Sequence, residues 1–288
     1  MADARITQRA FTLPVRGTDR LCLVREPARG APRGIVVHVP AFAEEMNKSR
    51  RMTAWCAREL AASGFRVVQI DLFGCGDSAG DFGDASWDAW VADIHAAVRC
   101  VRPADDVPLC LWGLRLGALL ACAALPALPR DTSMVFWQPV LSGQQHLAQF
   151  LRLAVAADVL AAEAGRTPTR QLRDRLLGGN ALEIAGYALA PELARGIDAA
   201  RLQLPAGFAG PIMWLEVAAM ASDDMSPASL EGIVRLRTAG AEVSPRVVSG
   251  PRFWQTVEIE DCPALIDATV EMVSSCCDDR LDRAATAV

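Results

Sequence analysis

A chain of 288 residues with 52% hydrophobic and 22% charged residues can form one large globular domain that carries an insertion. Its net charge is −5, so acidic residues outnumber basic ones, which argues against nucleic acid as a partner. Nine cysteines, an odd number without a C-x-x-C pair, favour reduced thiols in a cytoplasmic protein over a disulfide framework.

Short apolar runs, helix caps and turn residues predict strands and helices in alternation along the chain. The opening stretch MADARITQRAF lacks the apolar core of a signal peptide. In the first part of the chain we expect a hairpin turning at 16–19, buried strands at 34–39 and 65–70, a polar loop at 40–48, a helix at 49–63 between Ser49 and Gly64, and a helix at 86–101. In the last part we expect strands at 134–138, 212–217 and 242–248, a helix after Ser226 and a final helix from about 262.

The segment 107–125, VPLCLWGLRLGALLACAAL, organises the rest of the chain. It predicts a strand, a tight turn between Gly113 and Gly117, and an Ala/Leu-rich helix, which is the context of a nucleophile elbow, G-x-S-x-G. The apex of this turn holds Arg115, which cannot be deprotonated in a protein and is therefore neither nucleophile nor general base. Because Arg115 also interrupts the most apolar window, we expect no stable membrane insertion.

The alternation predicts an α/β fold, a mostly parallel sheet with helices on both faces. It breaks over 144–210, where two or three helices surround a short apolar stretch at 181–189. We interpret this region as a helical cap inserted over the sheet, with a separate small domain as the alternative. The expected division is 1–140 for the first part of the core, 141–210 for the cap and 211–288 for the second part of the core. We expect the charged tail after Cys277 to fray.

Ligands of such a sheet bind beyond the carboxyl ends of its strands, where the loops around Arg115 should converge. Arg115 would project from the start of a helix, where backbone N–H groups already favour negative charge. We expect it either to clamp the carboxylate or phosphate of an anionic small molecule, or to pair internally with Glu44, Glu45 or Asp223.

Other residues of the same loops are candidates for binding or chemistry. Glu44 and Glu45 are candidate general bases, with solvation or pairing to Arg50 and Arg51 as the alternative. The expected binding residues are Phe42, Leu116, Gln138, His146 and Trp254. We expect structural roles for Cys75, His38 and His95. No Cys, His and carboxylate cluster has metal-site spacing and no glycine-rich loop fits a nucleotide, so we expect neither metal nor cofactor.

Three short segments carry a family resemblance. HVPAF at 38–42 resembles the oxyanion loop of α/β-hydrolases, DLFGCGDS at 71–78 their D-x-x-G-x-G-x-S turn, and GLRLG at 113–117 their elbow. The longer runs AFAEEMNKSRRM, QIDLFGCGDSAGDFG, LWGLRLGALL and WQPVLSGQQHLAQFLR resemble the exosortase A system-associated hydrolases of the second type. The resemblance covers most of 34–270 and implies a bacterial cytoplasmic protein linked to exopolysaccharide production and exosortase-dependent protein sorting, a hydrolase by fold.

The catalytic triad of that superfamily can be compared with this chain position by position. The acid is expected after the strand at 212–217, where Asp223 and Asp224 lie. The histidine is expected after the last strand, but 249–254 reads SGPRFW, and all three histidines of the chain precede the acid. Because Arg115 also replaces the nucleophile, two of three members are missing, and we predict that Ser-His-Asp catalysis is absent.

Three functional hypotheses follow from the sequence. The protein is a degenerate α/β-hydrolase that binds an anionic or acyl small molecule, an active hydrolase or acyl transferase with a carboxylate and Arg115 mechanism, or a non-catalytic partner of another protein. An open, polar pocket around Arg115 favours the first two, whereas a filled pocket with an exposed apolar patch favours the third. The sequence leaves the ligand and the oligomeric state open.

Overall fold

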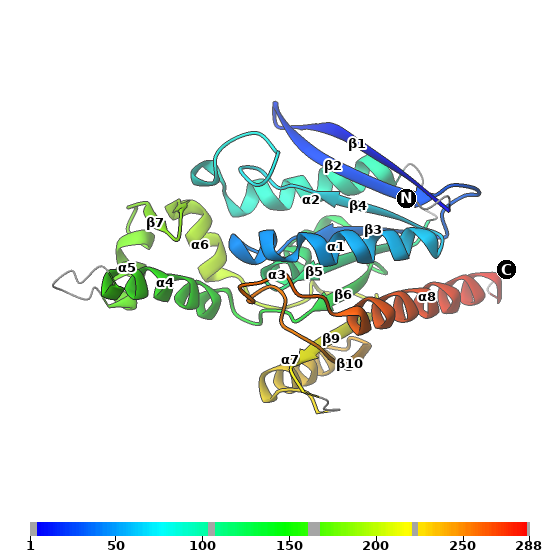
Figure 1. Ribbon diagram of the computed structural model, residues 1–288. Coiled ribbons are helices and arrows are strands. Elements are labelled where there is room, and N and C mark those ends of the chain that lie inside the picture. The colour runs from blue at the N-terminus through cyan, green and yellow to red at the C-terminus, as the bar shows by residue number, and fades with distance from the viewer. Residues whose placement is uncertain (1–4, 103–106, 161–167, 221–223, 287–288) are drawn as a thin grey trace.

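A single eight-stranded sheet runs through the molecule, and helices pack on both of its faces (Figure 1). The structure is a computed structural model that describes residues 5–102, 107–160, 168–220 and 224–286. The strand order is β1-β2-β4-β3-β5-β6-β9-β10. These strands are β1 (Ile6–Val15), β2 (Thr18–Pro27), β3 (Gly34–Val39), β4 (Phe65–Ile70), β5 (Leu109–Leu114), β6 (Ser133–Trp137), β9 (Ile212–Ala218) and β10 (Val243–Ser249).

The direction of the strands follows from the lengths of their connections. β1 and β2 form the predicted antiparallel hairpin, turned by Arg16 and Gly17, which have φ angles of 50° and 81°. β2 pairs antiparallel with β4, and every further pairing in the sheet is parallel. Parallel neighbours need a crossover, and a helix supplies it after β3, β4, β5 and β9. The predicted mostly parallel α/β fold is confirmed.

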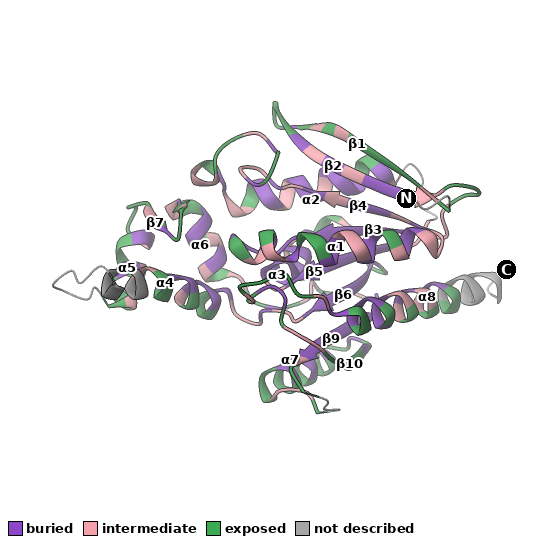
Figure 2. Cartoon of the chain, viewed as in Figure 1, coloured by how far each residue is buried: buried purple, intermediate pink, exposed green. Residues whose placement is uncertain are grey.

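Two hydrophobic clusters, one on each face, hold the helices to the sheet. α1 (Glu44–Ala62) and α8 (Pro263–Thr286) pack on one face, and α2 (Trp87–Val101), α3 (Leu116–Ala124) and α7 (Pro227–Thr238) pack on the other. Every residue of β3, β5 and β6 is buried, as expected for central strands covered on both faces (Figure 2).

The segment between β6 and β9 lies at the end of the sheet where β3 and β5 finish, at the left of Figure 1. It contains α4 (Gly143–Leu160), α5 (Thr169–Leu177), β7 (Leu182–Ile184), β8 (Tyr187–Leu189) and α6 (Pro191–Ala199). The apolar stretch at 181–189 is the β7–β8 hairpin. Leu176, Leu189 and Ile197 belong to the same cluster as α2 and α3. The division of the chain at 140 and 210 stays a prediction.

Two predicted boundaries are wrong. α1 begins at Glu44 rather than at Ser49, because Glu44 and Glu45 favour the positive end of the helix dipole, and Ala43, with φ 50°, makes the turn into it. Ser49 lies inside the helix and its hydroxyl donates to the Glu45 carbonyl at 2.6 Å. At the other end of the chain, α8 continues to Thr286 instead of fraying after Cys277.

Candidate functional site

The turn between β5 and α3 consists of one residue, Arg115. Its φ of 55° and ψ of −116° cost conformational energy for a residue other than glycine. The surrounding backbone fixes this conformation, because the Arg115 N–H donates to the Trp137 carbonyl at 3.0 Å and the Arg115 carbonyl accepts from the Val140 N–H at 3.2 Å. The predicted sharp strand–turn–helix is therefore present, with an arginine at its apex.

The two glycines of the turn are needed for close packing. A Cβ atom on Gly113 would lie 2.7 Å from the Cα atom of Ala118. A Cβ atom on Gly117 would lie 2.6 Å from the Pro40 carbonyl oxygen and would overlap the Val39 carbonyl. These approaches seat the apex against the loop that follows β3.

Arg115 forms an internal ion pair with Glu45 from the first turn of α1. Its Nε donates to Glu45 Oε1 at 3.0 Å, and its Nη1 donates to the Gln138 carbonyl at 3.4 Å. The side chains are 13% and 18% exposed, so the pair is largely withdrawn from water. The guanidinium also lies 5.8 Å from the centre of the Trp254 ring, within cation–π range.

A cavity of about 340 Å³ opens beside this ion pair. Its walls come from the start of α1, from α4 and from the loop after β10. It is lined by Phe42, Ala43, Glu44, Glu45, Lys48, Arg115, His146, Gln149, Phe150, Leu153, Trp254 and Gln255. The structure thus brings together six predicted site residues, namely Phe42, Glu44, Glu45, Arg115, His146 and Trp254. We call this space the elbow cavity.

Two predicted binding residues do not line the elbow cavity. Leu116 is fully buried at the start of α3. Gln138, with φ 43°, accepts a hydrogen bond from the Val217 N–H at its Oε1 and offers only its carbonyl to Arg115. Gln138 therefore positions Arg115 rather than facing a ligand. Asp223 lies outside the described residues, and Asp224 does not line the cavity.

Sequence reasoning missed most of the α4 wall. His146, Gln149, Phe150 and Leu153 follow the i, i+3, i+4, i+7 spacing that places side chains on one helix face. That spacing was visible in the sequence, but it does not tell which surface the helix faces. Phe150 packs edge-on against Phe42, with ring centres 4.9 Å apart.

Three buried polar atoms in the cavity lack a hydrogen-bond partner among the described residues: Glu45 Oε2, His146 Nδ1 and His146 Nε2. Glu45 Oε2 and His146 Nε2 are 4.0 Å apart. Burial raises the pKa of Glu45, and its contacts with Arg115 act in the opposite direction. Burial, assisted by the charge of Arg115, lowers the pKa of His146 to about 3. His146 is therefore neutral near pH 7.

The other acidic residue in the first turn of α1, Glu44, faces the rim of the cavity. It accepts hydrogen bonds from the Tyr187 hydroxyl at 3.1 Å and the Asn47 amide at 3.2 Å. Burial, followed by Glu44, raises the pKa of Tyr187 to about 12. Arg50 and Arg51, the partners considered for both glutamates, pair instead with Asp71 and Asp261.

The position where a triad histidine would follow β10 is filled by Phe253 and Trp254, both buried. Cys75 is also withdrawn from chemistry, because burial first and Asp71 second raise the pKa of its thiol to about 12. His95 contacts the Ala124 carbonyl through Nε2 at 2.8 Å, which agrees with its expected structural role.

Within the described part of the chain, no three His, Cys, Asp or Glu side chains form a cluster able to hold a metal ion. None of the described helices has the length and apolarity needed to cross a bilayer.

The strand order and the sharp turn between β5 and α3 are those of the α/β-hydrolase fold. A family model described as serine aminopeptidase, S33, matches residues 30–196, more than half of the chain. The chain therefore belongs to that α/β-hydrolase family.

Solved structures share the fold at low sequence identity. Est1E from Butyrivibrio proteoclasticus, solved with ferulic acid, is 14% identical with a TM-score of 0.65, over 92% of this chain and 98% of its own. A carboxyl esterase from Bacillus coagulans, in complex with glycerol, is 15% identical with a TM-score of 0.60, over 96% and 100% of the two chains. Mouse alpha/beta hydrolase domain-containing protein 10 is 16% identical with a TM-score of 0.60, over 96% and 99%. Such identities establish the fold alone. No curated protein matches the sequence.

Proposed function

We propose that the protein binds a small molecule with an anionic headgroup and an apolar or acyl chain in the elbow cavity, without Ser-His-Asp catalysis. The observation that carries this proposal is a permanently charged guanidinium at the apex of the elbow, lining a cavity with Phe42, Phe150 and Trp254. A guanidinium binds a carboxylate or phosphate through two parallel hydrogen bonds, and the aromatic wall removes the rest of the ligand from water.

A bound anion would take the place of Glu45 as the partner of Arg115. Displacing a buried carboxylate usually leaves an uncompensated charge, at a cost of several kcal/mol. Here burial already raises the pKa of Glu45, so the displaced carboxyl group can take up a proton. One anion enters while another is neutralised, and the charge of the cavity stays balanced.

The biological setting of this activity rests on the sequence resemblance. The runs that resemble the exosortase A system-associated hydrolases include AFAEEMNKSRRM and LWGLRLGALL, which supply Glu45 and Arg115. We therefore place the ligand in the bacterial exopolysaccharide and exosortase system. Nine free cysteines support a cytoplasmic location.

Substitution of Arg115 tests the proposal, with octanoate as ligand and octanol as its uncharged analogue. We expect octanoate to bind the wild type more tightly than octanol does. We also expect the affinity for octanoate to fall as the salt concentration rises. The R115K variant keeps the charge without the planar fork and should bind more weakly, and R115A should lose about 2–5 kcal/mol of binding free energy. Isothermal calorimetry measures both ligands on wild type, R115K and R115A. R152A, on the exposed side of α4, is the charge-matched control.

Equal affinities for octanoate across wild type, R115K and R115A would contradict a binding role for Arg115. The interpretation as a non-catalytic partner of another protein would then lead.

A second candidate function is hydrolysis by an activated water. It is favoured by the 4.0 Å gap between the unpartnered Glu45 Oε2 and His146 Nε2, which one water molecule can bridge. In that reaction Glu45 removes a proton from the water, the water oxygen bonds to the acyl carbon, and Arg115 stabilises the negative charge that develops on the carbonyl oxygen. The acyl–oxygen bond to the leaving alcohol then breaks, and the proton held by Glu45 passes to that leaving oxygen.

Fluorophosphonate labelling separates this candidate from serine catalysis. We expect no labelling of the purified protein, because no serine stands at the elbow apex. Mass spectrometry maps any adduct, and stoichiometric labelling of Ser78 or Ser142 would contradict the expectation. Turnover of p-nitrophenyl octanoate that resists the probe and disappears in E45Q would favour the activated water.

A further inference from the structure

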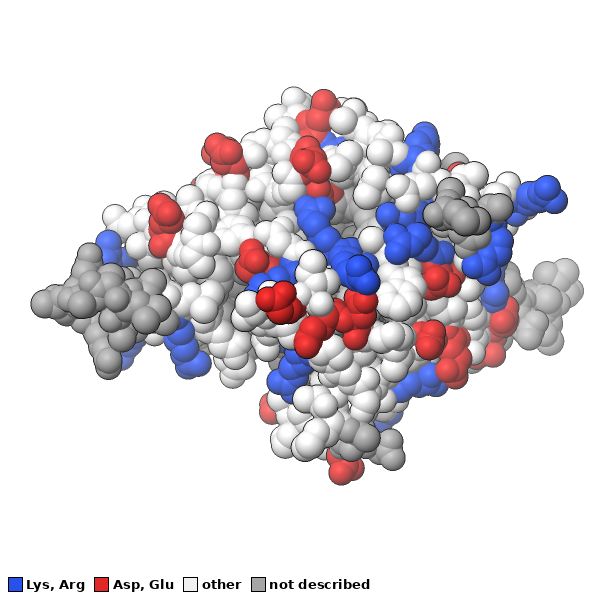
Figure 3. Space-filling model, viewed as in Figure 1, with Lys and Arg blue, Asp and Glu red and all other residues white. Residues whose placement is uncertain are grey.

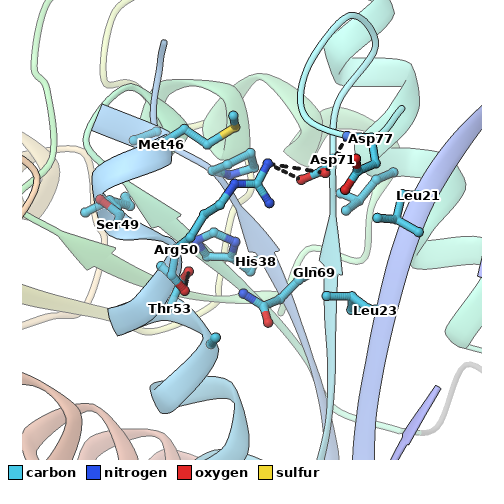
Figure 4. Close-up of a pocket in the computed structure, with 15 residues that line it drawn as sticks. Leu21, Leu23, His38, Met46, Ser49, Arg50, Thr53, Gln69, Asp71 and Asp77 are labelled. Atoms are coloured by element: carbon cyan, nitrogen blue, oxygen red, sulfur yellow. Dashed lines mark hydrogen bonds and ion pairs between the residues drawn. The ribbon is translucent and has the colours of Figure 1, made fainter. Parts of the chain in front are cut away.

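A second cavity, of about 260 Å³, lies between α1 and the strands β2 and β4 (Figure 4). It shares no lining residue with the elbow cavity. Leu21 and Leu23 of β2 form one wall, Arg50 of α1 forms the opposite wall, and His38 and Gln69 form the floor. We call it the α1–β2 cavity.

The floor of the α1–β2 cavity contains an unsatisfied polar group. His38 is only 5% exposed, and its Nε2 has no hydrogen-bond partner among the described residues. One side of the ring packs on Trp112, with centres 4.5 Å apart. Burial first and Arg50 second lower the pKa of His38 to about 3, so its imidazole is neutral near pH 7. A buried polar atom of this kind calls for a ligand or water to satisfy it.

Gln69 presents hydrogen-bond donors to the same space. Its Oε1 accepts a hydrogen bond from Arg25 Nη1, which turns the amide so that its nitrogen faces His38 in Figure 4. Leu23 pairs with Gln69 across β2 and β4, and Arg25 follows two positions along β2 on the same face. The Gln69 amide in the cavity floor is therefore hydrogen-bonded directly to the Arg25 guanidinium.

That guanidinium is buried, and no carboxylate of the described residues pairs with it. Arg25 is 4% exposed and bonds only the amide oxygens of Gln8 and Gln69 among the described residues. Burial, followed by the nearby charge of Arg58, lowers the pKa of Arg25. Arg58 lies two turns after Arg50 on α1, and Figure 3 shows basic side chains gathered over this part of the molecule. An uncompensated buried charge is costly, and an anion would offset it.

The ion pair at the cavity mouth leaves Arg50 able to serve a ligand. Arg50 is 46% exposed and donates to both Asp71 oxygens at long distances, 3.2 and 3.3 Å. Asp71 Oδ2 also accepts from the Asp77 N–H at 3.0 Å, so Asp71 keeps a partner when Arg50 moves. Gly76 makes room for the pair, since a Cβ atom there would overlap both side chains.

We propose that the α1–β2 cavity is a second binding site, for a small anion that carries a carboxylate or phosphate group. Arg50 and the Gln69 amide bind the anion directly. Arg25, which bonds two amide oxygens, and Arg58 add positive charge beside the cavity, while Asp71 and Asp77 line its mouth on the side of Arg50. Leu21 and Leu23 contact any apolar remainder.

The three histidines of the chain allow a test by NMR, because each reports on a different place. His38 lies in the α1–β2 cavity, His146 lies in the elbow cavity and His95 lines neither. Their ring ¹H–¹³C signals, assigned by single substitutions, are followed while sodium phosphate and, separately, sodium acetate replace chloride at constant pH and ionic strength. We expect a saturable shift of the His38 signal with at least one of the two anions, while the His95 signal stays in place.

Variants of α1 separate a site from general electrostatics. R50Q should raise the dissociation constant read from the His38 signal about tenfold or more, because it removes a charge-assisted contact. R58Q should raise that constant several-fold, because it removes a nearby positive charge. R51Q removes the same charge from the same helix but at a position paired to Asp261, and should leave the constant unchanged. Equal weakening in R51Q and R58Q, or no saturable His38 shift with either anion, would overturn the proposal.

The same spectra keep the two cavities apart. A shift of His146 without one of His38 would support the elbow cavity alone and overturn the second site. A shift of His38 without one of His146 would support the second site whatever becomes of the function proposed for Arg115.

Discussion

Two side chains decide what the elbow cavity can do chemically. Arg115 stands at the apex where the fold presents a nucleophile, and Trp254 stands in the loop where it presents a histidine. The guanidinium carbon of Arg115 lies 5.8 Å from the centre of the Trp254 ring, so these two side chains interact directly. A guanidinium beside an aromatic ring can bind an anion, but neither of these two side chains transfers a proton near pH 7.

Restoring only the nucleophile therefore should not restore hydrolysis. We expect R115S to show no esterase turnover above wild type, because the imidazole near the apex is that of His146, whose pKa of about 3 makes it a weak proton acceptor. Turnover of p-nitrophenyl acetate measures this. Robust turnover in R115S that is lost in the R115S/H146Q double variant would show that His146 reaches the apex and activates the new hydroxyl.

At the scale of elements, the start of α1 decides which glutamate pairs with Arg115. The sequence predicted Glu44, Glu45 and Asp223 as partners but placed both glutamates in a loop, where they are equivalent. In a helix, successive side chains point about 100° apart, so only Glu45 turns toward the elbow, while Glu44 meets Tyr187. The start of α1 was predicted wrongly because the turn before it depends on Ala43 at φ 50°. An alanine in a sequence does not indicate a positive φ.

The elbow glycines were predicted correctly because a strand–turn–helix leaves a local pattern. G117A should destabilise the fold by about 1–3 kcal/mol, since its methyl group would press on the Val39 and Pro40 carbonyls. Urea unfolding followed by circular dichroism measures the loss. G83A is the control, because a Cβ atom there meets its nearest neighbours at an ordinary 3.5 Å. Equal stability of G117A and wild type would contradict the steric reason given for this glycine.

At the scale of the molecule, strand alternation and turn residues in the sequence predicted the parallel sheet, the hairpin and the position of the site at the strand ends. They did not predict the α1–β2 cavity, because it depends on how far α1 stands from β2, a long-range packing distance with no local pattern. Both cavities flank α1, and each holds one buried neutral histidine, His38 or His146.

These two histidines make the stability of the whole molecule sensitive to acid. Each has a folded pKa lowered to about 3 from an ordinary value of 6.5. A lowered pKa contributes stability above the unfolded value, which is lost as the pH falls from about 6.5 toward 3. We expect the free energy of unfolding of H38Q to fall by about 2 kcal/mol less than that of wild type between about pH 7 and pH 5, as measured by urea titration.

Comparing the variant with wild type at each pH removes the opposite contribution of Glu45 and Asp93. Burial raises the pKa values of these two carboxyl groups in the folded state, so their contribution to the stability of the fold increases as the pH falls. Between about pH 7 and pH 8.5, where the imidazoles are neutral in both states, H38Q and wild type should change in parallel. An equal loss in both proteins between about pH 7 and pH 5 would contradict the buried, neutral state of His38.

The walls of the elbow cavity come from widely separated parts of the chain, and this fixes when during translation the site can exist. Residues 42–48 and 146–153 leave the ribosome first, whereas Trp254 follows only after β9 and β10. The family-matched region 30–196 ends before Trp254, so it lacks one wall of the cavity. A nascent chain therefore has no complete elbow cavity until β10 has joined the edge of the sheet and the loop that carries Trp254 has followed it.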